Sequence, residues 1–363
     1  MAGTNPLAAM KIKKLIGFKQ ITPGVITGDV TTALNRCGID ALTSVYTSSS
    51  EFSIGSMSVL GNTFYGLKIT TKAQTFSGYV FMDLIDIASK LEEHPIQVGF
   101  RLTQSATTNN KTNIDMVKFK NSSDFNLDQK ITPQTEDNST YYEIVFSANK
   151  KDNVVYAQVY LNKQLITSAK STGYKDYPVS IQIGNNLNPD PGTSFSYMIG
   201  DMYIAELDPN SDGTVKPQLL GNITLEPFTV ASYSGDKHNN TKNQDIVTAL
   251  NTLDPNNDMG ALAIKPVEQP ASVTFNAPDI AGKSIYGASL NIVYKDSIAP
   301  NNRLNYQITE GTTQLPAETI TTRNADVVGF TTFSRILTTP EGGGEWNADN
   351  LKFRLDLLNK GAE

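Results

Sequence analysis

The chain contains 363 residues, of which 39% are hydrophobic and 18% are charged. This length accommodates about two domains with buried cores, and a formal charge of −6 without a basic cluster disfavours electrostatic binding to nucleic acid. With one cysteine, Cys37, and two histidines, His94 and His238, the chain can form no internal disulfide and no thiolate or imidazole zinc site, since even an open zinc site needs about three protein ligands.

Threonine and asparagine replace the missing charge, with 38 and 32 residues respectively. The branched Cβ of threonine favours strands, and the asparagine side chain favours turns because it can imitate the backbone. The composition therefore predicts an all-β protein of many short strands joined by polar turns, and no cofactor site is expected.

Residues 1–20 are predicted to form a short basic N-terminal arm that docks onto a neighbouring subunit, with lysines at 11, 13, 14 and 19. The apolar stretch at residues 15–18 is shorter than the core of about 7–15 residues that a signal peptide needs. No stretch approaches the roughly 18 apolar residues of a membrane-spanning helix. We therefore expect neither secretion by a signal peptide nor membrane insertion.

Residues 21–212 carry the pattern of a first β-sandwich. In residues 96–102, four apolar residues alternate with Gln97, Gly99 and Arg101, a period of two that is typical of a strand. Residues 154–161 repeat the pattern, and Asn162 and Lys163 predict a hairpin turn into residues 164–166. Further strands are predicted at residues 65–70, 79–82, 141–146, 179–183 and 198–205.

Helical signals are few. Leu84, Ile87, Ala88 and Leu91 share one helical face, with Asp83 as a cap before them and Pro95 as a stop after them. This spacing predicts one short helix or strand connection over residues 83–94, and residues 243–253 show a weaker signal.

A turn-rich run at residues 208–213 predicts the domain boundary, so that residues 213–363 form a second β-sandwich. Its strands are predicted at residues 272–275, 286–294, 304–308, 328–333 and 351–357. Asp208, Asn210 and Asp212 also match the first half of a calcium-binding loop, but Leu219 stands where the bidentate acid would be. A plain interdomain turn is therefore favoured over a metal site.

Candidate catalytic groups are scarce. No strand carries the clustered acids that glycoside hydrolysis needs, and neither histidine lies near a Gly-x-Ser-x-Gly motif. The single tryptophan, Trp346, could stack on a sugar ring, but a lone tryptophan more often closes the end of a sandwich. We therefore assign no catalytic, cofactor or metal residues, and spacing alone does not locate a glycan site.

Three ordered segments resemble known proteins. Residues 142–165, 179–184 and 199–205 are similar to the concanavalin-like or laminin-G-like jelly roll, in which a late strand carries a Gly-Asp turn. Residues 220–223 with Pro227 resemble a Leu-Gly-Asp-Val strand that opens a second β domain in many tailed-bacteriophage virion proteins. Residues 340–357, with Trp346, look like the ending of those same proteins. Asn222 stands where the usual acid would be, and Arg354 where the closing strand usually carries Gly.

This resemblance implies a non-enzymatic structural protein of the virion, from the tail, tail fibre or baseplate region. It implies assembly with other virion proteins and into a homo-oligomer, and a jelly roll that binds host-surface glycans or neighbouring subunits. One alternative is a capsid-decorating or head-fibre protein that clamps capsomers. Another, less favoured, is a polysaccharide-degrading enzyme.

Overall fold

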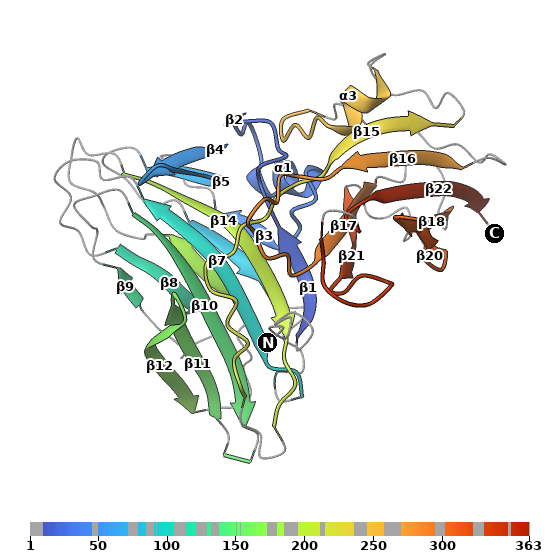
Figure 1. The fold of residues 1–363 in the computed structure, drawn as a ribbon. Helices are drawn as coiled ribbons and strands as arrows, with labels where there is room; N and C mark the ends of the chain where they lie inside the picture. The colour runs from blue at the N-terminus through green and yellow to red at the C-terminus, as the bar shows by residue number, and fades with distance from the viewer. Residues whose placement is uncertain are drawn as a thin grey trace. The chain divides into compact units, whose positions relative to one another are not determined.

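The computed structural model describes residues 10–45, 50–71, 79–84, 91, 93–104, 114–120, 129–131, 138–149, 151–152, 154–172, 180–184, 195–210, 215–235, 245–257, 270–294, 302–321, 330–347 and 350–362. These residues form antiparallel strands with the short helices α1 (Val30–Arg36) and α3 (Ile246–Leu250), which confirms the all-β prediction (Figure 1). In this part of the chain no helix is long and apolar enough to cross a membrane.

Contacts divide the chain into two compact units. Unit 1 contains Met1–Lys19, Pro23–Thr31 and Asp40–Leu225, and unit 2 contains Gln20–Thr22, Thr32–Ile39 and Glu226–Glu363. Each unit has its own sheets and is described separately below.

Unit 1 is built on a nine-stranded sheet. Its strand order is β12 (Gln164–Thr172), β11 (Val154–Leu161), β10 (Asn138–Asn149), β7 (Ile96–Gln104), β14 (Phe195–Glu206), β5 (Asn62–Thr71), β4 (Ser50–Val59) and β2 (Gly24–Val25), with β1 (Lys11–Ile16) paired to β14 beside this path. A five-stranded sheet has the order β3 (Leu42–Val45), β6 (Tyr79–Asp83), β13 (Ser180–Gly184), β8 (Ile114–Lys120) and β9 (Gln129–Ile131).

Alternation along the strands builds the core of unit 1. Val98 and Phe100 of β7 are fully buried, as are Ile181 and Ile183 of the smaller sheet. Phe100 lies opposite Tyr142 of β10 in the register, and their rings stack with centroids 5.6 Å apart. The strands predicted in this region from their period of two are therefore confirmed.

The predicted turn at Asn162 and Lys163 joins β11 to β12, and both residues have positive φ, 46° and 70°. Two residues with φ above zero match the twist of a hairpin, and asparagine tolerates this conformation well. The Gly-Asp pair at residues 200 and 201 lies inside β14, where the register shifts and Asp201 has φ 45°. It forms a bulge that turns the Asp201 side chain away from the regular ladder.

The stretch predicted as an N-terminal arm contributes a strand. β1 pairs with β14 over Lys11 to Ile16, and Ile12 and Ile16 are buried. Lys13 Nζ lies 2.8 Å from Glu206 Oε1, and Lys14 Nζ lies 2.7 Å from Asp40 Oδ2. Both ion pairs lie within unit 1. The described part of this stretch is thus held by the chain's own sheet.

Unit 2 contains a six-stranded sheet and a two-stranded ribbon. The sheet has the order β15 (Thr229–Ser234), β16 (Ala271–Asn276), β22 (Phe353–Ala362), β18 (Asn302–Glu310) and β19 (Thr313–Gln314), with β20 (Glu318–Thr321) also paired to β18. The ribbon pairs β17 (Ala288–Tyr294) with β21 (Thr331–Leu337). Its Leu290, Ile292 and Phe333 pack against the core of the sheet.

Helix prediction has a mixed outcome. Residues 246–250 form α3, and the Asp245 side chain caps it by accepting from the Thr248 N–H at 3.0 Å. For the stretch predicted at 83–94, residues 85–90 and 92 lie outside the described residues, and Asp83 belongs to β6. Asp83 is therefore the last residue of a strand, paired with Ser180.

Candidate binding face

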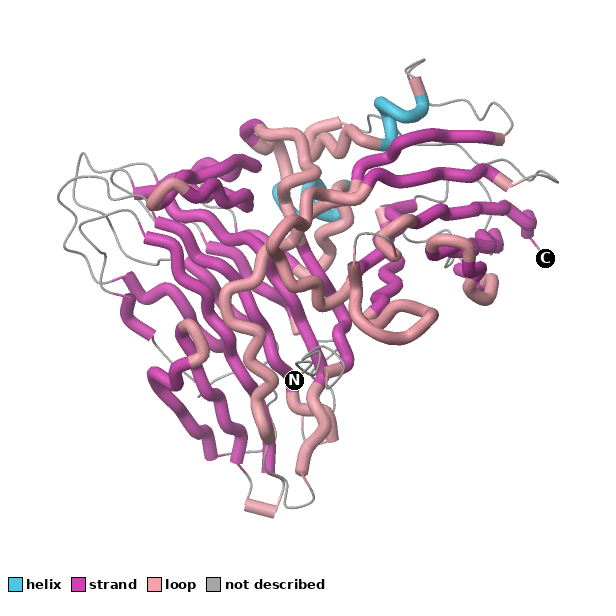
Figure 2. The backbone as a smooth tube through the Cα atoms, viewed as in Figure 1, coloured by secondary structure: helices cyan, strands magenta, loops and turns pink. Residues whose placement is uncertain are grey.

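Both faces of β7 are buried, although its sequence predicts one apolar and one polar face. Gln97, Arg101 and Thr103 on the polar face are at most 2% exposed. The residues that cover this face come from a loop after β14, residues 215–225, which we name the strap. Figure 2 shows this loop, in pink, running along the strands of unit 1.

The first part of the strap is held by Gln97 and Glu143. The Gln97 side-chain amide donates to the Gln218 carbonyl and accepts from its N–H, both at 3.0 Å. The Glu143 carboxylate accepts from the backbone N–H of Leu220 at 2.7 Å and of Gly221 at 3.1 Å. The Tyr203 hydroxyl donates to the same carboxylate at 2.6 Å.

The second part of the strap is held by Arg101 and Asp201. Arg101 Nε donates to Asp201 Oδ2 at 2.8 Å, and its Nη2 donates to the Ile223 carbonyl. The other Asp201 oxygen accepts from the Leu225 N–H at 2.9 Å. The guanidinium carbon lies 4.4 Å from the centroid of the Phe64 ring, so the charge is both paired and stacked.

Burial sets the protonation of these groups. It raises the pKa of Glu143, while hydrogen bonds from Tyr203, Leu220 and Gly221 oppose that rise. Burial also raises the pKa of the Tyr141 and Tyr203 hydroxyls, so both remain neutral donors. The carboxylate oxygens of Glu143 and Asp201 accept hydrogen bonds from backbone N–H groups of the strap. This arrangement fastens the strap to the sheet rather than presenting a reactive acid.

The same sheet face continues beyond the strap onto β11 and β12. Tyr156 is 37% exposed, and the register places it between Ser147 of β10 and Lys170 of β12. Gln158 lies two residues further along the same face, opposite Ser168. We name this group, Ser147, Tyr156, Gln158, Ser168 and Lys170, the open face.

The open face combines the groups that contact sugars. A tyrosine ring offers a flat apolar surface with a hydroxyl at its edge, and amide, hydroxyl and ammonium groups supply donors and acceptors at fixed positions. Sequence periodicity does place Tyr156 and Gln158 on one face. It does not show which part of that face the strap leaves uncovered.

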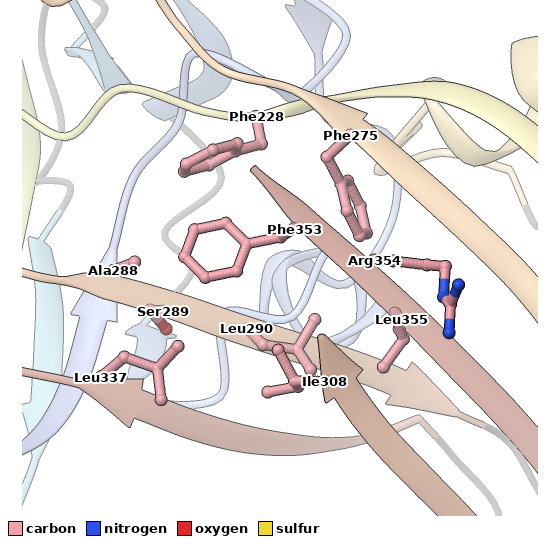
Figure 3. Close-up of a pocket in the computed structure, with 10 residues that line it drawn as sticks. All are labelled: Phe228, Phe275, Ala288, Ser289, Leu290, Ile308, Leu337, Phe353, Arg354 and Leu355. Atoms are coloured by element: carbon pink, nitrogen blue, oxygen red, sulfur yellow. The ribbon is translucent and has the colours of Figure 1, made fainter. Parts of the chain in front are cut away.

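Unit 2 contains a small apolar pocket of about 60 Å³. Phe228 and Phe353 meet edge to face at its upper side, with centroids 5.4 Å apart, and Leu290, Ile308 and Leu337 lie below them (Figure 3). Sites for larger ligands usually occupy at least about 300 Å³. This pocket is a packing gap in an apolar core and does not match the size or polarity of a sugar.

The remaining residues considered from the sequence are dispersed. Asp208 and Asn210 follow β14 in unit 1, while Asp212 and His238 lie outside the described residues. His94 is half-buried just before β7. No three His, Cys, Asp or Glu side chains among the described residues are grouped to hold a metal ion.

Cys37 and Trp346 are both buried. Burial raises the pKa of the Cys37 thiol to about 12, so it is not a nucleophile at neutral pH. Trp346 is 6% exposed, packs against Phe353 and donates to the Thr338 carbonyl at 3.3 Å. Its ring is therefore part of the unit 2 core and does not present a face to a sugar.

Comparison with known proteins gives distant structural similarities only. No family model and no curated protein matches the sequence. A carbohydrate esterase of the Shiga toxin-encoding bacteriophage phi24B aligns at 12% identity and TM-score 0.30, over 51% of this chain and 100% of its own. A structure of botulinum neurotoxin type C aligns at 11% identity and TM-score 0.29, over 87% of this chain and 88% of its own. Lectin I of Ulex europaeus aligns at 7% identity and TM-score 0.25, over 46% of this chain and 98% of its own.

Proposed function

We propose that this chain is a non-enzymatic structural protein of a tailed-bacteriophage particle, from the tail, tail fibre or baseplate region. In this proposal it assembles as a homo-oligomer with other virion proteins, and unit 1 binds host-surface polysaccharide. The virion assignment rests on the three sequence segments that resemble such proteins. The glycan assignment rests on one structural observation, the exposed Tyr156 ring set among polar side chains on an otherwise covered sheet face.

The chemistry of the open face suits a neutral or acidic polysaccharide. The Tyr156 ring would stack on the C–H side of a sugar, and Gln158 and Ser168 would bind its hydroxyls. Lys170 lies directly opposite Tyr156 and supplies a positive charge for a carboxylate or sulfate on the same chain. These groups lie on neighbouring strands of one sheet, which hold them in place without ordering a loop on binding.

The non-enzymatic part of the proposal is supported by the roles of the buried acids. Glu143 and Asp201 hold the strap, and Glu310 in unit 2 accepts from the Glu341 N–H at 3.2 Å. Burial raises the pKa of Glu310 as well. Each of these perturbed or buried carboxyls has a structural partner rather than an approach path for substrate.

The test is binding of the purified protein to host-cell polysaccharide, measured on a glycan array and by cosedimentation. Tyr156→Ala should weaken binding about tenfold, the effect of removing one aromatic contact worth roughly 1.4 kcal/mol. Tyr286→Ala, which removes a half-buried tyrosine of unit 2, is the matched control and should bind as the parent does. Equal loss in both variants, or no binding by the parent, would overturn the glycan assignment.

Two further measurements address the alternatives. A fall in polymer size during incubation with the polysaccharide would contradict the non-enzymatic assignment. Electron microscopy of particles that carry a tag at the C-terminus of this protein should place the label on the tail, and a label on the capsid would support a head-decorating role instead.

A further inference from the structure

A hydrogen bond along β11 fixes the direction of one amide on the open face. The Tyr160 hydroxyl donates to Gln158 Oε1 at 3.2 Å. Residues two apart on a strand point to the same side of the sheet, so this bond runs along the open face itself. A glutamine amide has one oxygen and one NH2 group. Because Tyr160 engages the oxygen, Gln158 offers a bound molecule its NH2 group, which only donates.

Tyr160 is a fixed support for this amide, because it lies buried between two neighbouring strands. It is 8% exposed, and burial raises the pKa of its hydroxyl, which therefore remains a neutral donor. Glu143 of β10 lies opposite it on one side. On the other side the register shifts, so that Leu165 lies opposite Tyr160 and Ile166 is passed over. Such a bulge re-aims side chains at one point of a strand, and here it brings Leu165 onto the face that carries Tyr160.

Positive charge predominates around the open face. Within the described part of the chain, the charged residues of β10, β11, β12 and their connecting turns are Glu143, Lys151, Asp152, Lys163 and Lys170. Glu143 is 1% exposed and bonds to the strap, and the Asp152 carboxylate accepts from Asn149 at 2.8 Å in the turn between β10 and β11. Lys170 is exposed and forms no ion pair with any residue that the structure describes. The open face therefore presents one ammonium group and no carboxylate.

Lys170 and Gln158 are close enough to bind one anionic group together. They are diagonal neighbours on paired strands, because Lys170 lies opposite Tyr156 and Ser168 lies opposite Gln158. Diagonal neighbours are about 7–8 Å apart, within reach of long side chains. The Ser168 hydroxyl is next to both residues on the same face and can also donate. An ammonium, an amide NH2 and a hydroxyl thus border one position on the sheet.

We propose that the open face selects an anionic polysaccharide over a neutral one, with a carboxylate or sulfate bound between Lys170 and Gln158, and that Tyr160 is a positioning residue for the Gln158 amide. Hydrogen bonds to an ionised acceptor are roughly twice as strong as those between neutral groups, and the ammonium adds the attraction of its charge. A sugar hydroxyl gains neither contribution. This selectivity rests on the glycan binding proposed above and narrows it to one class of ligand.

The first experiment measures binding of the full chain to two matched pairs of polymers: polygalacturonate with its carboxyl-reduced form, and dextran sulfate with dextran. In at least one pair the anionic member should bind about fivefold or more tightly than the neutral one, the gain from an exposed charge pair and its hydrogen bonds. The pair that responds identifies the anionic group. Equal binding within both pairs, or no binding to either polyanion by a protein that binds host-cell polysaccharide, would overturn the selectivity alone. Failure to bind host-cell polysaccharide would overturn the glycan assignment as well.

A single-atom exchange tests the Gln158 amide. Gln158→Glu replaces the NH2 group by an oxygen in a side chain of the same size, and should weaken polyanion binding at least tenfold because a donor becomes an anion. Binding of the neutral polymer should change less than about twofold. Gln164→Glu is the matched control, because Gln164 is an exposed residue of β12 opposite Leu161, on the other side of the sheet. Equal losses of polyanion binding in the two variants would show general repulsion and overturn the proposal.

Two further variants separate the charge from the positioning role. Lys170→Gln should weaken polyanion binding about threefold to fivefold, whereas Lys352→Gln, at an exposed lysine of unit 2, should have no effect. Tyr160→Phe keeps the buried ring and should lower the ratio of polyanion to neutral binding about twofold to threefold. In a Gln158→Ala background it should change this ratio no further, because it acts through that amide. An unchanged ratio in Tyr160→Phe, or additive effects of the two changes, would contradict the positioning role, and unchanged binding by Lys170→Gln would contradict the anion site.

Discussion

Removal of the Glu143 carboxylate should release the strap and destabilise unit 1. The carboxylate accepts from the Tyr203 hydroxyl at 2.6 Å, from the Leu220 N–H at 2.7 Å and from the Gly221 N–H at 3.1 Å. In Glu143→Ala these three donors lose their acceptor. The Glu143 side chain is 1% exposed, so water cannot take its place without a change in the packing.

The magnitude follows from two opposing contributions. Hydrogen bonds to a charged group contribute roughly 1.5–3 kcal/mol each, whereas burial of the carboxylate costs free energy, as its raised pKa indicates. Each neutral donor that is left buried without an acceptor costs about 1–3 kcal/mol. We therefore expect a loss of about 3 kcal/mol for Glu143→Ala. Glu143→Gln should lose about 1–2 kcal/mol, because one amide N–H would face a backbone donor.

The assay combines urea unfolding with amide hydrogen exchange. The exchange of the Leu220 and Gly221 amides should accelerate in Glu143→Ala more than that of β7 amides, because the strap opens before the sheet. Glu345→Ala, which removes an exposed glutamate of unit 2, serves as the control and should change neither measurement. A loss below about 1 kcal/mol, or unchanged exchange at Leu220 and Gly221, would refute the role assigned to Glu143.

Three further changes have defined outcomes. Leu60 is 91% exposed in a hairpin turn and has φ 50°, a conformation that strains a leucine. Leu60→Asn should therefore raise the free energy of unfolding by about 0.5–1 kcal/mol in urea titration, and a decrease would contradict this. A Cβ at Gly99 would lie 2.0 Å from the Tyr203 ring, so Gly99→Ala should lower thermal stability by about 1–3 kcal/mol, and a neutral result would show that the ring can move. Burial would raise the pKa of Glu206, but ion pairs with lysines such as Lys13 lower it overall. The contribution of Glu206 to the free energy of unfolding is therefore present above pH 4.5 and lost as the pH falls below that value. Glu206→Gln should remove this slope from the pH dependence of unfolding.

Local signals predicted the secondary structure well where they were strong. The alternation at residues 96–102 and 154–161 corresponds to β7 and β11, and the Asn162-Lys163 turn joins β11 to β12 as expected. The weaker helical signal at residues 243–253 corresponds to the short helix α3, which the structure shows to be capped by Asp245. These features depend on contacts within a few residues, which a sequence pattern records directly.

Long-range features were not visible in the same patterns. Gln97, Gly99 and Arg101 occupy the polar face of β7, and a polar face usually indicates solvent. The structure instead places Gln97 against Gln218, 121 residues away, and buries Arg101 beside Asp201. The basic N-terminal stretch similarly contains a strand, because the acidic and apolar residues that receive it, such as Glu206, lie at the end of β14.

Composition and periodicity predict a chain of strands and turns, with few residues suited to metal or nucleophilic chemistry. Composition and periodicity do not distinguish the polar residues that fasten the strap from those that remain on the open face around Tyr156, whereas the fold does. Strand formation responds to local periodicity, whereas the burial of a sheet face depends on a segment that is distant in the chain and close only in the fold.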